Sequence, residues 1–178
     1  LQRDAAVAAA HRAADLLGGA GATEFITAMV ASWEWGPREE LTDAQWDHAA
    51  ELLLEIEAIV AERGLAQALH PHLGTMLERR DDARRLLERS ELGWTFDTGH
   101  LMIGGYDPLE FLADAGERIR HVHLKDVHLD RAAPVFAGDQ SIMEGVQAGM
   151  FCPMGDGDVP IAEVVRALEQ RRYDGWYV

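Results

Sequence analysis

Three apolar segments of this sequence each end in side chains that can bind a metal or move a proton. The segments span residues 65–69, 92–96 and 119–124, and the side chains are, in chain order, His70, His72, Asp97, His100, His121, His123 and Lys125. Imidazole and carboxylate ligands together suit Mn²⁺, Co²⁺, Fe²⁺ or Zn²⁺, whereas Ca²⁺ favours a shell of oxygen atoms. If the three segments end side by side, the sequence predicts a site for Mn²⁺, Co²⁺, Fe²⁺ or Zn²⁺.

Each of these motifs, taken alone, also fits an ordinary loop. A single histidine near a strand end is more often hydrogen-bonded within a loop than bound to a metal. The run from Asp97 to Gly99 and the run from Gly155 to Asp158 both consist of common turn residues. Five histidines, one aspartate and one lysine at three successive segment ends are harder to attribute to chance. We therefore favour a metal site.

Side-chain alternation along the third segment supports this interpretation. In a strand, His121, His123 and Lys125 share one face, while Val122 and Leu124 point the other way. The apolar pair suits a layer packed against helices, which directs the imidazoles and the ammonium inward. Unpaired polar groups cost free energy when they are buried, so a polar inner face at a strand end indicates function rather than stability.

The elements that must position these residues are expected to alternate between strand and helix. Strands are predicted at residues 25–30, 65–69, 92–96, 119–124 and 175–178, with a further short one possible at 151–154. Helices are predicted at residues 1–17, 42–64, 75–89 and 161–171, with a short one starting at Asp107-Pro108. Thr42 and Gln45 form a capping-box pattern. The region 129–150 is expected to be irregular with one short helix.

Strand and helix repeats spaced by roughly 25–35 residues imply parallel strands with helical crossovers. A doubly wound sheet and a (β/α)₈ TIM barrel both fit, but no glycine-rich dinucleotide turn follows any strand, which favours the barrel. About six strands are expected, against the eight of a full barrel. The sequence starts in a helical pattern at Leu1 and stops in an apolar run at Val178. We therefore expect one α/β domain over residues 1–178, an incomplete barrel that lacks the first strands and the end of the last.

Composition excludes several classes of protein. The formal net charge of −15 disfavours a nucleic-acid partner, which requires clustered Lys and Arg. No apolar run approaches the length of a membrane span. The single cysteine, Cys152, excludes a disulfide framework and suits a reducing cytoplasm. We expect a cytoplasmic protein with a small-molecule substrate, and the sequence leaves a homodimer open.

The motifs resemble those of the sugar isomerases and epimerases with a xylose isomerase-like TIM barrel, and within that group those of the inosose dehydratases. The resemblance covers most of residues 65–178. It rests on His70-Pro71-His72-Leu73-Gly74-Thr75, Asp97-Thr98-Gly99-His100, the run from Arg118 to Val127, the run from Ala148 to Gly157, and Tyr173-Asp174-Gly175-Trp176.

The resemblance implies a divalent metal, Mn²⁺ or Co²⁺ first and Zn²⁺ or Fe²⁺ as alternatives, held by one residue from each of four strands. Asp97 and His123 match two ligand positions, and His70 matches a third, where many relatives have a glutamate. The fourth ligand is expected to be a glutamate shortly after the Gly-Trp motif, beyond Val178. Pro160 is a further departure, because relatives often have a helix-capping aspartate there.

The reaction implied by the resemblance is the loss of water from 2-keto-myo-inositol (inosose) in inositol catabolism, through an enediolate. Lys125, His100 and His72 are the candidates for acid, base or substrate contact, and the sequence does not assign their individual roles. An isomerase or epimerase acting on a keto-sugar would use the same metal site. A phosphodiester-cleaving DNA-repair enzyme is disfavoured by the net charge. A non-catalytic chain is a third alternative, because the expected fourth ligand is missing.

Overall fold

A parallel β-sheet forms the centre of the protein, whose computed structural model describes residues 3–30, 38 and 40–178. Its strands follow chain order in space, as β1 (Glu24–Thr27), β2 (Ala66–Leu69), β3 (Gly93–Asp97) and β4 (Ile119–His123). Every neighbouring pair is parallel. A parallel bridge between Val122 and Tyr177 places the C-terminal segment beside β4. Parallel neighbours require crossover connections, which are usually helical.

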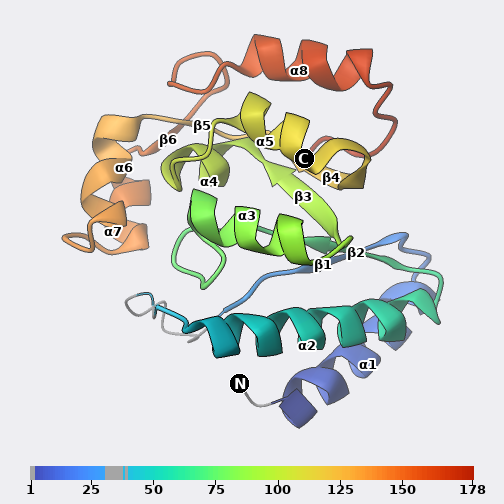
Figure 1. Ribbon diagram of the computed structural model, residues 1–178. Helices are drawn as coiled ribbons and strands as arrows, with labels where there is room; N and C mark the ends of the chain where they lie inside the picture. The colour runs from blue at the N-terminus through green and yellow to red at the C-terminus, as the bar shows by residue number, and fades with distance from the viewer. Residues whose placement is uncertain (1–2, 31–37, 39) are drawn as a thin grey trace.

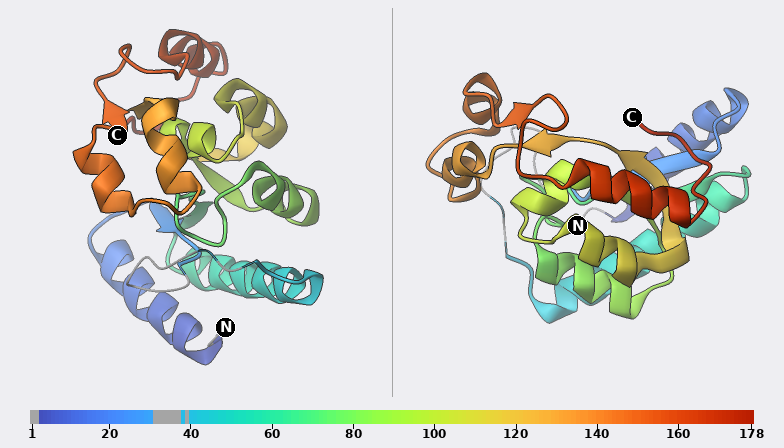
Figure 2. Two further views of the ribbon diagram at one scale, coloured as in Figure 1. Left: turned by 90° about the vertical axis from the view of Figure 1, so that its left-hand side faces the viewer. Right: turned by 90° about the horizontal axis from the view of Figure 1, so that it is seen from above.

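Helices supply these crossovers and cover one face of the sheet (Figure 1). The covering helices are α1 (Arg3–Gly19), α2 (Asp43–Ala61), α3 (Arg80–Arg89), α5 (Pro108–Ala115) and α8 (Ile161–Gln170). Figure 2 shows them as an outer layer around a curved sheet, like an arc of a barrel. The predicted alternation of strand and helix is confirmed. None of the helices in the described part of the chain is both long and apolar enough to cross a lipid bilayer.

The main core lies between the sheet and this helical layer. Trp94, Phe96 and Val122 are fully buried and belong to one cluster with apolar residues of α2, α3, α5 and α8. Because side chains alternate along a strand, their neighbours Asp97 and His123 point to the opposite, inner face. The apolar outer face therefore fixes the direction of the polar residues.

Helix α2 begins after Thr42, as the sequence predicts, and it ends at Ala61, shortly before the predicted end at Gly64. The Thr42 hydroxyl accepts a hydrogen bond from the main-chain N–H of Gln45, and the Gln45 side-chain oxygen accepts one from the main-chain N–H of Thr42. This capping box satisfies two N–H groups that the first turn leaves unpaired. The chain turns after the helix at Gly64, whose φ of 75° is a conformation that favours glycine.

The loop between β2 and α3 is longer than predicted. Helix α3 begins at Arg80 and not near Thr75. The Asp82 carboxylate accepts hydrogen bonds from the main-chain N–H groups of Glu78 at 3.2 Å and Arg79 at 2.8 Å. These bonds fix the start of the helix, because an N-terminal turn needs acceptors for its free N–H groups.

The region 129–150 holds two helices, so the prediction of one is wrong. They are α6 (Leu129–Phe136) and α7 (Ile142–Gln147), and they pack against each other. Ser141 and Glu144 form a capping box at the start of α7, a pattern that the sequence contains. A further helix, α4 (Thr98–Ile103), directly follows β3 and was not predicted. Short helices carry too little periodicity for sequence patterns to identify them.

Candidate metal centre

The three residues predicted as metal ligands meet at the carboxyl ends of adjacent strands. His70 directly follows β2, Asp97 ends β3 and His123 ends β4. Asp97 lies opposite His123 in the register of the sheet. One ligand atom from each of the three residues lies within 4.8 Å of the other two. The parallel sheet produces this arrangement, because equivalent positions on neighbouring strands share a face.

The carboxylate of Asp97 is the centre of this cluster. It is fully buried, and its Oδ2 atom lies 3.1 Å from Nε2 of His70 and 3.1 Å from Nδ1 of His123. The ammonium group of Lys125 contacts the same oxygen. Burial raises the pKa of Asp97, but the hydrogen bonds from His123 and His70 outweigh it and hold the pKa well below its usual value. The carboxylate is therefore ionised at neutral pH.

This set of donor atoms fits a divalent cation. Two imidazole nitrogens and a carboxylate oxygen form the mixed set that suits Mn²⁺, Co²⁺, Fe²⁺ or Zn²⁺. A buried carboxylate also needs a compensating positive charge, and in this structure the ammonium of Lys125 provides one. The site thus combines suitable ligands with a buried negative charge, which Lys125 balances in this structure and which a metal cation would also balance.

His72 and His100, two of the candidates for proton transfer, lie next to the cluster. Their ring centroids are 3.8 Å apart. Nδ1 of His72 lies 2.7 Å from the main-chain oxygen of Leu73 and must donate to it, whereas Nδ1 of His100 accepts from the main-chain N–H of Leu73 at 3.3 Å. Burial lowers the pKa of His72 and lowers that of His100 well below its usual value. Both rings are therefore neutral at pH 7, with opposite tautomers.

A family model described as a xylose isomerase-like TIM barrel matches residues 1–178. The chain belongs to this family. The predicted fold class is thereby confirmed, and the four-stranded sheet with its helical layer is the part of such a barrel that the described residues form.

Individual members and structural neighbours of this xylose isomerase-like family agree with that assignment. An inosose dehydratase of Geobacillus thermodenitrificans is 36% identical over 77% of this chain and 47% of its own length. The chain thus spans about half the length of the curated relatives it matches. A probable 3-DHS dehydratase of Bacillus anthracis, AsbF, has the same fold, with a TM-score of 0.75 at 15% identity over 99% of this chain and 64% of that one. The IOLI protein, solved with a bound zinc atom, has a TM-score of 0.68 at 12% identity over 96% of this chain and 58% of that one.

Beside the candidate metal site of this xylose isomerase-like barrel, a second buried carboxylate organises a loop. Asp126 Oδ2 accepts hydrogen bonds from the main-chain N–H groups of Gly155 at 2.8 Å and Gly157 at 2.9 Å. Its Oδ1 accepts from those of Val159 at 3.0 Å and Val127 at 2.9 Å. The glycine-rich run that the sequence left open is therefore a loop, held in place by one aspartate from the neighbouring strand β5 (Asp126–Val127).

Replacing Asp126 by asparagine is expected to lower the free energy of unfolding by about 2–3 kcal/mol, because an amide NH₂ would face two N–H donors that have lost their acceptor. Burial raises the pKa of Asp126, but its main-chain hydrogen bonds lower it overall. The carboxylate thus contributes stability above its unfolded pKa of about 3.9, and this stability is lost as the pH falls through the lower folded pKa. Urea denaturation at pH 7 and below pH 4 would measure both effects.

The acid-induced loss of stability should be shallower in Asp126→Asn than in the native protein. Asp130→Asn, at an exposed position on α6, provides the matched control. It should change neither the free energy of unfolding at pH 7 nor its loss at acidic pH. An unchanged free energy of unfolding in Asp126→Asn would contradict the role of Asp126 in holding the loop.

His121 lies on the inner face, as predicted, but outside the three-residue cluster. Its ring centroid is 5.0 Å from that of His123. Among the described residues, no hydrogen-bond partner reaches its buried Nδ1 atom. Burial lowers the pKa of His121, so its ring is neutral at pH 7. Its position behind His123 makes it part of the wall of the site.

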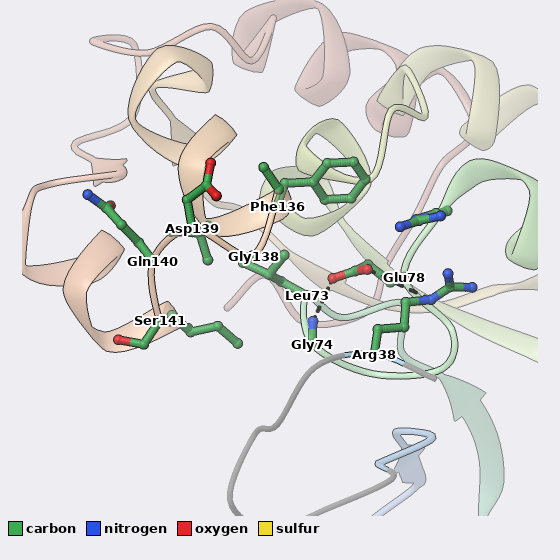
Figure 3. A pocket seen from close by; sticks show the side chains of 13 residues that line it. Arg38, Leu73, Gly74, Glu78, Phe136, Gly138, Asp139, Gln140 and Ser141 are labelled. Atoms are coloured by element: carbon green, nitrogen blue, oxygen red, sulfur yellow. Dashed lines mark hydrogen bonds and ion pairs between the residues drawn. The ribbon is translucent and has the colours of Figure 1, made fainter. Parts of the chain in front are cut away.

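A cavity of about 510 Å³ opens beside the loop that carries His72 (Figure 3). Leu73 and Gly74 lie on one side of it, and residues 135–142 lie on the other. The Glu78 carboxylate lines the cavity and accepts a hydrogen bond from the main-chain N–H of Gly74 at 2.7 Å. The cavity lining includes Leu73, the chain neighbour of His72, but among the described residues neither His72 nor His100 lines it.

Proposed function

We propose that the intact protein is a divalent-metal-dependent hydro-lyase that removes water from 2-keto-myo-inositol. The observation that carries this proposal is the convergence of His70 and His123 on the buried carboxylate of Asp97, next to an ammonium group and two neutral imidazoles. The 36% identity to a protein named inosose dehydratase supports the choice of substrate. Because the chain spans about half the length of such relatives, activity and substrate are proposed for the intact protein.

His70, Asp97 and His123 are the proposed ligands. A divalent ion held there would act as a Lewis acid towards the ketone and hydroxyl oxygens of the substrate. Mn²⁺ or Co²⁺ is expected, with Zn²⁺ or Fe²⁺ as alternatives, because the nitrogen and oxygen donors suit all four.

The hydrogen bonds around Leu73 suggest different tasks for the two neutral histidines. His72 donates from Nδ1, so its lone pair is on Nε2, and we assign it as the base that takes the proton next to the carbonyl. His100 accepts at Nδ1 and therefore carries its proton on Nε2. This makes His100 a hydrogen-bond donor to a substrate hydroxyl and a poor candidate for the base.

Lys125 is the proposed acid. When the carbon–oxygen bond breaks, its ammonium gives a proton to the departing hydroxide, which leaves as water. The electron pair of the broken carbon–hydrogen bond becomes the new carbon–carbon double bond. The proton held on His72 then returns to Lys125 through solvent, and the site is restored. An isomerase or epimerase would use the same first step and return the proton to carbon.

The decisive experiment follows 2-keto-myo-inositol by mass spectrometry. Intact protein is stripped with a chelator, and Mn²⁺ or Co²⁺ is restored in deuterated solvent. Metal-dependent loss of one water, abolished in His123→Ala and kept in His48→Ala on helix α2, would establish the dehydratase. Deuterium incorporation into carbon without loss of water would show an isomerase or epimerase instead. The absence of both signals would overturn the proposal for this substrate.

A further inference from the structure

Lys125 is the only lysine of the sequence, in which the other fifteen of the sixteen basic residues are arginines. Its side chain reaches the buried oxygen of Asp97. Its main chain lies between β4 and β5, where the parallel ladder has already ended. A flexible side chain starting from such a segment needs other contacts to fix its direction.

Thr98 provides these contacts. Its hydroxyl donates a hydrogen bond to the main-chain oxygen of Lys125 at 2.7 Å and accepts one from the main-chain N–H of Lys125 at 2.9 Å. Thr98 is fully buried and directly follows Asp97. One side chain thus replaces, for Lys125, both hydrogen bonds that a neighbouring strand would supply. The same segment that carries the carboxylate therefore fixes the origin of the ammonium side chain.

Gly99 allows the two segments to approach closely enough for these bonds. A Cβ atom at Gly99 would lie 2.8 Å from Cβ of Lys125 and 3.1 Å from a methyl group of Val127. Both distances are shorter than ordinary carbon–carbon contacts of about 3.5–4.0 Å. Any larger residue at this position would push the main chain of Lys125 away from α4.

We propose that Thr98 and Gly99 are positioning residues, which hold the main chain of Lys125 so that its ammonium meets Asp97 and the reacting atoms. The kinetic part of this inference rests on the proposed function, whereas the placement of the ammonium does not. Thr98→Val keeps the shape of the side chain and removes both hydrogen bonds. Thr98→Ser keeps the hydroxyl. This conservative variant should therefore keep both hydrogen bonds and the native position of the Lys125 ammonium.

The placement of the ammonium is tested by trace acylation with an acetylating reagent at fixed pH. The intact protein is used, with peptide mapping at Lys125 and the amino terminus as the internal reference. Thr98→Val should raise the relative rate at Lys125 by about fivefold or more, the size expected from weakening one charge-assisted hydrogen bond. Thr98→Ser should leave this rate near that of the native protein.

Ser90→Ala is the matched control for removal of a buried hydroxyl, because the hydroxyl of Ser90 donates a hydrogen bond to the main-chain oxygen of Leu86 in its own helix, far along the chain from Lys125. It should leave the acylation rate at Lys125 unchanged. Should Thr98→Val fail to fold, Gly99→Ala tests the same idea by displacing the main chain of Lys125 while the Thr98 hydroxyl is kept. The proposal would be overturned if a folded Thr98→Val or Gly99→Ala variant were acylated at Lys125 at the same rate as the native protein.

A double-mutant cycle separates positioning from general stability. Thr98→Val should lower kcat by about 10- to 100-fold through misplacement of the lysine, with KM little changed. The same substitution added to Lys125→Met should cost nothing further, because residues that act together are not additive. Equal losses in both backgrounds would show that Thr98 acts through something other than Lys125. Since acylation needs no substrate, failure of the proposed reaction would leave that first test intact.

Discussion

Asp97→Asn is expected to abolish tight metal binding and to lower turnover by about 10³-fold, the equivalent of several kcal/mol of lost Lewis-acid stabilisation. Asparagine has the same shape but no charge, and its amide nitrogen is no ligand. The Oδ2 atom of Asp97 is where His70 and His123 converge. Calorimetric titration of chelator-treated protein with Co²⁺, followed by turnover measurements, would test both effects.

The same variant should remain folded, since Trp94 and Phe96 hold β3 against the helices through its other face. Circular dichroism and urea denaturation check this requirement. Asp47→Asn, at an exposed position on α2, is the matched control and should bind Co²⁺ as the native protein does. Unchanged Co²⁺ affinity in Asp97→Asn would remove Asp97 from the proposed set of ligands.

The parts of the site that sequence patterns predict are those fixed by strand periodicity. Val122 is apolar and therefore faces the helices. Because side chains alternate along the strand, His123 then lies on the inner face, opposite Asp97 in the sheet register. The strand ends were predictable for the same reason, because β2, β3 and β4 are short apolar segments followed by polar residues. Once the strands are parallel and adjacent, their carboxyl ends meet without further information.

The parts that sequence patterns did not predict depend on contacts between distant residues. The hydroxyl of Thr98 bonds to Lys125 across 27 positions of the chain, and nothing in the local sequence marks that pairing. Asp126 likewise accepts hydrogen bonds from Gly155 and Gly157, about thirty residues away. Both residues belong to motifs that the sequence did single out. The residue types next to Thr98 and Asp126 predicted a functional site from the sequence alone. The hydrogen bonds that Thr98 and Asp126 themselves make depend on the folded structure, and the sequence did not predict them.

The opposite tautomers of His72 and His100 are a further case. Both histidines follow strand ends, and their side chains have the same intrinsic chemistry. Leu73 distinguishes them, because its oxygen accepts from one ring and its N–H donates to the other. The main chain of a single residue thus holds two identical side chains in different tautomers, which no pattern of residue types contains.

Lys125→Met is expected to separate catalysis from metal binding. The methionine keeps an unbranched apolar stem and removes the ammonium, so kcat should fall by about 10²- to 10⁴-fold, the usual contribution of a positioned acid. Co²⁺ binding should survive and become about tenfold tighter, because the ammonium contacts the same Asp97 oxygen and competes for its charge. Turnover assays and calorimetric titration of the same samples give the two quantities.

Arg131→Met is the control for removal of a cation. The Arg131 guanidinium donates a hydrogen bond to the main-chain oxygen of Gly149, and its loss should change neither kcat nor the affinity for Co²⁺. Lys125→Met and Asp97→Asn should differ in their effect on metal affinity. Loss of the carboxylate should remove metal affinity and turnover together, whereas loss of the ammonium should remove turnover alone. If Lys125→Met instead lost Co²⁺ affinity in step with kcat, the lysine would be holding the ligands in place, and the acid would have to be sought elsewhere. Tighter binding with slower turnover would mean that one carboxylate oxygen serves two cations in turn.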